Sequence, residues 1–91
     1  MQFDITIHGK GGHGSRPDKS HNPIECFPPI YAAMQQLPGG CHITKVIGGN
    51  STNIIPNDLL ISGSCAEEDY EELKNILNSL CGVYHCTAEF K

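Results

Sequence analysis

The chain has 91 residues and a formal net charge of −4, from 10 acidic side chains against 6 lysines and arginines. A chain of this length forms one domain that folds alone with little margin, and a negative charge without any basic run argues against nucleic acid or an anionic membrane as a partner. No apolar run approaches the roughly 20 residues that span a bilayer, and no signal-peptide pattern opens the sequence.

The first half of the chain predicts a strand, a loop and a helix. Strict alternation of apolar and polar residues over 2–8 indicates a strand with one buried face. A glycine-rich loop follows, and apolar residues at helical spacing then indicate a helix over 22–37, opened by an asparagine N-cap and a proline. Inside a helix, Pro28 and Pro29 would each cost about 3 kcal/mol, so we expect either a kink or a main helix that starts at Pro28.

The second half of the chain predicts three strands and a second helix. Gly63, in the middle strand, is typical of a bulge or a close backbone approach. Acidic residues between 67 and 72 open the helix, and we favour a role for them in stabilising the helix dipole over a metal or acid–base site. Gly82 is expected to end this helix as its C′ residue. The three strands predicted here are 41–47, 59–65 and 83–90.

The predicted order of elements is β-α-β-β-α-β. Both crossovers should be right-handed, and the compact solution is an α+β fold: a ferredoxin-like split βαβ sandwich. It has a four-stranded antiparallel sheet with two helices on one face. Because the two edge strands remain open, we expect a homodimer that forms through a sheet edge or a helix.

Five cysteines are spread along the chain, an odd number without any Cys-x-x-Cys pair. Scattered cysteines among apolar neighbours are mostly small buried hydrophobic residues. We therefore expect free thiols and a reducing, cytoplasmic compartment, and we favour this over disulfides or a zinc site. The cysteines are Cys26, Cys41, Cys65, Cys81 and Cys86.

The least ordinary stretch is 8–17, where four glycines surround His13. It is not a Walker phosphate loop, because Lys10 is followed by glycine rather than by serine or threonine. Nor does it open a helix as a dinucleotide-binding motif would. A loop of this composition at the end of a strand can hold one side chain in a defined place, although a flexible loop with an idle histidine is equally consistent with the composition.

Two separated stretches, 3–17 continued by Asn22-Pro23-Ile24 and 47–56, carry a resemblance to a known family, and 61–64 adds a shorter match. The sequence resembles the dimerisation (lid) domain of M20-family metallopeptidases and amidohydrolases. Within this family, it resembles most the branch that contains the aminoacylases and hippurate hydrolases. The resemblance spans nearly the whole chain. It implies that 1–91 is a single lid domain, excised from a larger two-domain hydrolase.

The resemblance also implies a chemistry. The catalytic domain of the family binds two divalent metals, often zinc, and hydrolyses an amide through a metal-activated water. The parent protein is thus expected to be a metal-dependent amidohydrolase or peptidase that acts on an N-acyl amino acid or a small peptide-like substrate. The metal-ligand motifs of the family are absent from this sequence. We therefore expect the chain alone to be inactive, with no metal site and no cofactor of its own.

Two positions match functional residues of the family, and a third departs from the family's pattern. His13 matches the lid histidine that reaches the partner subunit's active site and holds the carbonyl oxygen there. Asn53 matches a substrate-binding asparagine, although turn chemistry alone also favours asparagine. Ala66 stands where family members commonly carry an arginine that binds a substrate carboxylate, which puts recognition of an α-carboxylate in doubt.

The remaining histidines and Lys10 are interpreted as structural or solvent-exposed residues. The alternative to the lid-domain hypothesis is a stand-alone ligand-binding or regulatory module of the same shape, because this architecture hosts many functions. Flanking metal-ligand motifs in the gene would distinguish the two. The histidines assigned no chemical role are His8, His21, His42 and His85.

Overall fold

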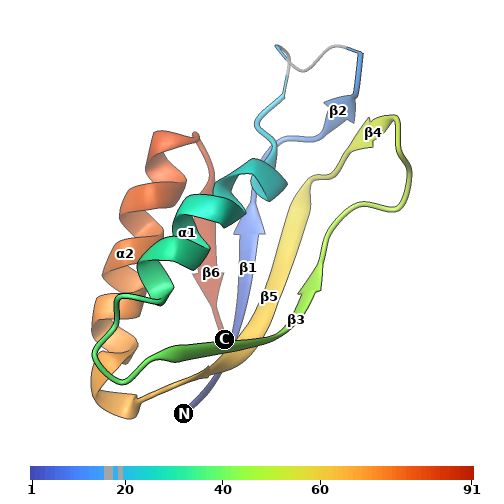
Figure 1. The fold of residues 1–91 in the computed structure, drawn as a ribbon. Coiled ribbons are helices and arrows are strands. Elements are labelled where there is room, and N and C mark those ends of the chain that lie inside the picture. The colour runs from blue at the N-terminus through green and yellow to red at the C-terminus, as the bar shows by residue number, and fades with distance from the viewer. Residues whose placement is uncertain (16–17, 19) are drawn as a thin grey trace.

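The computed structural model describes residues 1–15, 18 and 20–91 of the chain (Figure 1). Arg16 and Pro17, which close the first family-like motif, lie outside the described residues. The main sheet has the strand order β3-β5-β1-β6 with antiparallel pairing throughout, as the split βαβ sandwich requires. Its strands are β1 (Gln2–His8), β3 (Cys41–Ile47), β5 (Asp58–Cys65) and β6 (Thr87–Phe90).

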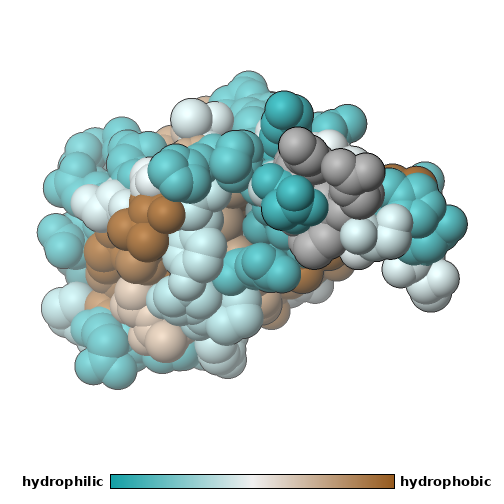
Figure 2. Space-filling view, turned by 90° about the horizontal axis from the view of Figure 1, so that it is seen from above, coloured by the Kyte–Doolittle hydropathy of each residue, from teal (hydrophilic) through white to brown (hydrophobic). Residues whose placement is uncertain are grey.

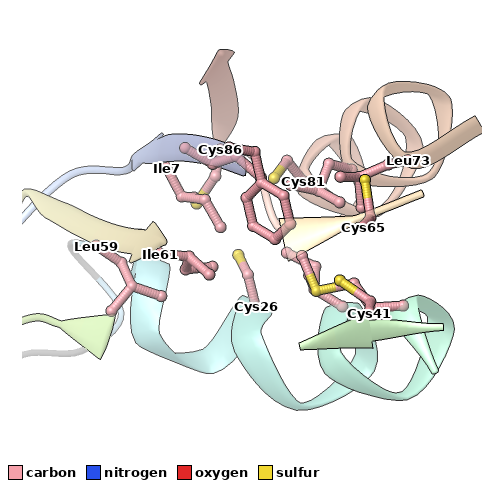
Figure 3. Close-up of a cluster of buried hydrophobic side chains, with 14 of the residues drawn as sticks. Ile7, Cys26, Cys41, Leu59, Ile61, Cys65, Leu73, Cys81 and Cys86 are labelled. Atoms are coloured by element: carbon pink, nitrogen blue, oxygen red, sulfur yellow. The ribbon is translucent and has the colours of Figure 1, made fainter. Parts of the chain in front are cut away.

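Two helices, α1 (Phe27–Met34) and α2 (Tyr70–Val83), cover one face of this sheet (Figure 1). The inward-facing residues of β1 and β5 pack against them and form the core (Figure 3). This confirms the face assigned to β1 from its alternation. The largest fully buried side chains of the core include Phe3, Ile5, Ile7, Ile30, Met34, Leu59, Ile61, Leu73 and Leu77.

The five cysteines are part of this core as buried, free thiols. Burial raises the pKa of Cys26 to about 12 and the pKa of Cys81 to about 11, so both thiols stay protonated at neutral pH. The Cys86 thiol lies 3.9 Å from the carbonyl oxygen of His21 and donates to it weakly. The cysteines therefore act as small hydrophobic residues, as expected.

The start of the first helix accommodates both prolines. A single 3-10 turn, η2 (Pro23–Cys26), precedes α1, and Asn22 Oδ1 accepts a hydrogen bond from the Ile24 amide at 3.0 Å. Pro28 and Pro29 then fall in the first turn of α1, where a missing N–H breaks no intrahelical bond. The α-helix itself is eight residues long and ends at Met34, which is shorter than the predicted stretch 22–37.

The close backbone approach predicted at Gly63 is present, opposite an irregularity in the neighbouring strand. The register between β3 and β5 shifts between Ile43 and Lys45. A Cβ at Gly63 would lie 2.2 Å from the carbonyl oxygen of His42, so no larger residue fits there. Thr44, at the irregularity, donates its hydroxyl to the Ser62 carbonyl at 3.3 Å.

The prediction that Gly82 ends the second helix is wrong. A 3-10 turn, η3 (Glu67–Asp69), leads into α2, which continues through Gly82 to Val83. His85 takes the left-handed conformation instead, with φ of 60°. The amides of His85 and Cys86 donate to the carbonyls of Gly82 and Cys81 at 3.1 and 2.8 Å, which is the hydrogen-bond pattern of a Schellman motif. The last strand consequently begins at Thr87 and not at residue 83.

A small two-stranded sheet, β2 (Gly12–His13) and β4 (Ile54–Ile55), extends beyond the main sheet and was not predicted. This projection gives the molecule its elongated shape, with extents of 41 × 23 × 20 Å. Figure 1 shows it at the end opposite the two termini. Among the described residues, no helix has the length and apolar character needed to cross a membrane.

Candidate functional site

The projection, which we call the arm, consists of residues 9–15 and 48–57. It joins the two stretches that carry the family resemblance. Gly12 pairs with Ile55 and His13 with Ile54, and the Gly14 amide donates to the Asn53 carbonyl at 2.7 Å. The two predicted site residues, His13 and Asn53, are therefore neighbours across one short ladder although 40 positions separate them in the sequence.

Backbone contacts that only glycine permits hold the base of the arm. Gly9 donates its amide to the Asn57 carbonyl at 2.8 Å, and Gly11 donates to Asn57 Oδ1 at 2.8 Å. A Cβ at Gly9 would lie 2.2 Å from the His21 carbonyl oxygen, and a Cβ at Gly11 would lie 2.5 Å from the Ile55 carbonyl oxygen. The glycines thus let three chain segments, at 9–11, 21 and 55–57, approach one another at the base of the arm.

The His13 imidazole is exposed at the arm, and its Nδ1 faces Ser15. Nδ1 lies 3.2 Å from the Ser15 backbone nitrogen and 2.7 Å from Ser15 Oγ. Because an amide N–H only donates, Nδ1 has to accept and carries no proton. The neutral ring therefore holds its proton on Nε2, which leaves an N–H donor on the other side of the ring.

The Asn53 side chain is also exposed, in the turn that leads into β4. Its Oδ1 accepts a hydrogen bond from the Ser51 hydroxyl at 2.6 Å. The amide NH₂ group of Asn53 is the remaining polar end of the side chain, and it carries two donors. Both predicted site residues thus have their acceptor atom engaged within the loop.

An open hollow of about 450 Å³ lies beside the arm. It is lined by the turn 48–52 and the apolar residues 54–56, and Gly14, Asn22 and Ile24 complete it. A Cβ at Gly48 would lie 2.6 Å from Leu59 Cδ1 and 3.4 Å from Ile24 Cγ1, so at Gly48 the backbone packs closely against these two side chains. In the view onto this end of the molecule, hydrophilic surface predominates around the arm, and a hydrophobic patch lies at the other side, toward the helices (Figure 2).

Ala66, at the position of the family's carboxylate-binding arginine, is remote from the arm. It follows Cys65 at the end of β5, whereas the arm joins the start of β5 at Asp58. Eight residues of strand span roughly 25 Å at about 3.3 Å per residue. The structure therefore does not bring Ala66 together with His13 and Asn53.

Of the other histidines, His8 has a well-defined structural contact on the sheet face that the helices leave open. Its Nδ1 lies 2.7 Å from Asp58 Oδ1 and its Nε2 lies 2.7 Å from Glu89 Oε1. His21 exchanges backbone hydrogen bonds with Lys10 at 2.8 and 2.9 Å, and its ring lies 5.1 Å from that of His85. These contacts agree with the structural roles assigned to His8 and His21.

The described residues do not form a metal site. Over 1–15, 18 and 20–91, no group of three or more histidine, cysteine, aspartate or glutamate side chains is arranged to hold a metal ion. The His8 cluster does not fit a metal either, because its two carboxylates lie on opposite nitrogens of the ring.

Sequence comparison identifies the class of domain. Residues 1–82 match the peptidase dimerisation domain of the M20 family, and the chain belongs to this family. It is 32% identical to thermostable carboxypeptidase 2 of Saccharolobus solfataricus, over 98% of this chain and 27% of that protein. It is 27% identical to the N-acetylcysteine deacetylase of Bacillus subtilis, over 99% of this chain and 28% of that protein. The chain thus spans about a quarter of the length of these relatives.

Solved structures share the same fold. A crystal structure of a putative aminohydrolase from methicillin-resistant Staphylococcus aureus superposes with a TM-score of 0.86 at 24% identity, over 99% of this chain and 28% of that chain. The YXEP protein of Bacillus subtilis, described as a dinuclear metal-binding peptidase of the M20 family, superposes with a TM-score of 0.74 at 26% identity, over 99% and 24%. These likenesses confirm the α+β sandwich predicted from the order of elements.

Two contacts in the site were not foreseen, those of Ser15 and Ser51. The prediction considered His13 and Asn53 as isolated positions. The available signal was a serine two residues from each of them, since serine hydroxyls readily bond to groups two positions away.

Proposed function

We propose that the chain is the dimerisation and lid domain of a metal-dependent amidohydrolase or peptidase that hydrolyses an amide bond of an N-acyl amino acid or small peptide-like substrate. Membership of the M20 dimerisation-domain family supports this over a stand-alone ligand-binding module. The relatives are named for the same kind of bond, in a carboxypeptidase and a deacetylase. We also propose that the whole protein belongs to the aminoacylase-like branch of the family.

The observation that carries the proposal is the hydrogen bonding of the His13 ring in the arm. Its Nδ1 is engaged by Ser15, so the exposed ring offers an N–H donor at Nε2. Amide hydrolysis builds negative charge on the carbonyl oxygen, and one preorganised donor to that oxygen is worth about 10²–10³ in rate. We assign this role to His13, acting on the active site of the partner subunit, and a substrate-binding role to Asn53.

Two divalent metal ions, most simply zinc, are placed in the catalytic domain of the whole protein and outside this chain. The description of the related YXEP protein as a dinuclear metal-binding peptidase supports this. Such metals supply the activated water and polarise the carbonyl group. The residues of this chain add only positioning and a hydrogen-bond donor, so the 91-residue chain alone is expected to be inactive.

For the homodimer we propose the edge of β3 as the pairing surface. β3 is seven residues long and β6 only four, so β3 offers the longer row of unpaired backbone groups. Val46 and Ile47, at the end of β3, are exposed apolar side chains on this edge strand. The five free, buried cysteines support a reducing compartment, and we propose the cytoplasm.

The test is His13→Ala in the whole enzyme. We expect kcat to fall by about 10²–10³ because a donor to the developing oxyanion is lost, while sedimentation shows the same dimer. Asn75→Ala, which truncates an exposed side chain on α2, outside both the arm and β3, is the control and should leave kcat unchanged. An unchanged kcat in His13→Ala would contradict the catalytic role.

Mixing subunits tests whether His13 acts in the partner's site. A His13→Ala subunit with intact metals is combined with a subunit that lacks its metal ligands but retains His13. If the histidine acts across the interface, the mixture regains about a quarter of the wild-type activity, because half of the dimers are mixed and each has one complete site. If the histidine acts within its own subunit, the mixture stays as inactive as its components.

A further inference from the structure

Each candidate residue of the arm has a serine two positions away that contacts its acceptor atom. The Ser15 hydroxyl and amide lie 2.7 and 3.2 Å from His13 Nδ1. The Ser51 hydroxyl donates to Asn53 Oδ1 at 2.6 Å. Both serines are exposed, and both lie in loops. Neither contact belongs to the backbone ladder of β2 and β4.

We propose that Ser15 and Ser51 are positioning residues, which turn the acceptor atoms of His13 and Asn53 inward so that the arm offers hydrogen-bond donors to its substrate. Such a surface selects groups that only accept, namely carbonyl and carboxylate oxygens. This inference rests on the proposed function of the arm. It adds the two residues that determine whether donors or acceptors of His13 and Asn53 face the substrate.

For His13, the amide donor of Ser15 selects the tautomer, and the Ser15 hydroxyl then donates to the same Nδ1 atom and holds the ring in place. The ring nitrogen Nδ1 has a single lone pair, available only when the proton is on Nε2. A proton on Nδ1 would face the Ser15 amide N–H, donor against donor. The hydroxyl provides the shorter contact, so it contributes most to holding the ring angle. Without it, the exposed ring can rotate away and take up a proton on Nδ1.

For Asn53, the Ser51 hydroxyl decides which end of the amide faces outward. The side-chain oxygen and nitrogen of asparagine occupy similar space, so a free side chain presents either one. A donor to Oδ1 at 2.6 Å holds the oxygen within the loop and turns the NH₂ group away from it. An NH₂ group can bind a substrate oxygen, and it rejects a substrate donor.

The competing explanation is that each serine merely closes a turn, because serine side chains often bond to groups two residues away. The two explanations predict different results. A turn-closing serine stabilises the loop whatever the tautomer of His13. A positioning serine changes the tautomer and ring mobility of His13, and a threonine in its place restores both, because threonine keeps the hydroxyl.

The first experiment uses nitrogen-15 NMR of the imidazoles in the 91-residue chain, with the His13 resonances assigned by their loss in His13→Gln. We expect His13 to carry its proton on Nε2 in the wild type and in Ser15→Thr. In Ser15→Ala the share of the Nδ1–H tautomer should rise. Ser79→Ala, on the exposed side of α2, is the matched control and should leave the tautomer unchanged. A tautomer ratio that is the same in Ser15→Ala and the wild type would overturn the proposal for Ser15.

The second experiment measures steady-state kinetics of the whole enzyme. Ser15→Ala should lower kcat by about three- to tenfold, the range expected for one hydrogen bond, and Ser15→Thr should restore it. Ser51→Ala should raise KM by a similar factor for substrates with a free carboxylate. Equal kinetics of Ser51→Ala and the wild type would overturn the proposal for Ser51.

The two experiments separate this inference from the function on which it rests. An NMR shift in Ser15→Ala together with a full kcat in His13→Ala would contradict the function and keep the positioning role. A low kcat in His13→Ala with an unchanged tautomer in Ser15→Ala would support the function of His13 and contradict the positioning role of Ser15.

Discussion

At the scale of single residues, His8 joins carboxylates from two neighbouring strands on the open face of the sheet. The hydrogen bond to Glu89, followed by the one to Asp58, raises the pKa of His8 above its ordinary value of 6.5. The same contact with His8 is the main cause that lowers the pKa of Glu89 below 4.5. Because the three residues come from β1, β5 and β6, this cluster ties the sheet together across its exposed face.

The two shifts define the pH range in which the cluster stabilises the fold. The pKa of His8 is raised, so its contribution is complete below pH 6.5 and is lost as the pH rises through the raised value. The pKa of Glu89 is lowered, so its contribution is present above pH 4.5 and is lost as the pH falls through the lowered value. Both contributions are present between pH 4.5 and 6.5.

His8→Gln should therefore lower the free energy of unfolding more at about pH 5.5 than at about pH 8.5. The difference should be modest, because the side chains of His8 and Glu89 are 43% and 52% exposed and water screens the pair. Urea denaturation at the two pH values measures it. His42→Gln, an exposed histidine on β3, serves as the control and should show the wild-type pH dependence. A loss for His8→Gln that is equal at both pH values would contradict this interpretation.

At the scale of elements, the end of α2 offers a second test. Gly82 lies within the helix, and a Cβ built there meets nothing within 4 Å. Glycine inside a helix is less stable than alanine by about 0.5–1 kcal/mol, because the unfolded chain has more freedom to lose. We expect Gly82→Ala to raise the free energy of unfolding by about this amount. Had Gly82 been a left-handed C′ residue, alanine would destabilise the protein.

Gly9→Ala is the matched comparison, because the same substitution meets a backbone atom there. Its Cβ would lie 2.2 Å from the His21 carbonyl oxygen and 2.8 Å from Pro23 Cδ. Forcing the chain apart at this point should cost about 1–3 kcal/mol. Thermal unfolding of the two variants should move in opposite directions, and a Gly9→Ala variant as stable as the wild type would show that the base of the arm is less tightly packed than the distances imply.

The elements that could be predicted from the sequence are those with a local signal. β1 and β3 match their predicted bounds because alternation and β-branched residues mark a strand within one window. The end of α2 could not be predicted, because histidine rather than glycine adopts the left-handed conformation there. β2 and β4 have two residues each, and only their pairing across some 40 positions makes them strands.

The candidate site was predicted only in part for the same reason. His13 and Asn53 were chosen by resemblance to a family, and the local sequence supported turn chemistry equally well. Their proximity comes from the arm, where glycines permit contacts between distant backbone segments. The Ser15 and Ser51 contacts depend on how the loops fold, and composition alone does not determine that.

At the scale of the whole molecule, the sheet has two free edges with different character. β6 is short, whereas β3 is longer and carries the exposed apolar side chains of Val46 and Ile47. A homodimer that pairs two copies of β3 would continue the sheet across the interface and bury these side chains. It would also fix the direction in which each arm projects from the dimer, because β3 leads directly into the arm at Gly48.

Val46→Lys should therefore weaken the dimer without unfolding the domain, because Val46 is already 43% exposed. Two added lysines would face each other across paired edges, and lysine on an edge strand is a known means of preventing such pairing. Thr87→Lys places the same charge on the β6 edge and should leave the dimer intact. Analytical ultracentrifugation over a concentration series measures both. Dissociation in Thr87→Lys together with a stable Val46→Lys dimer would assign the interface to β6, and the arms would then project from the dimer in a different direction.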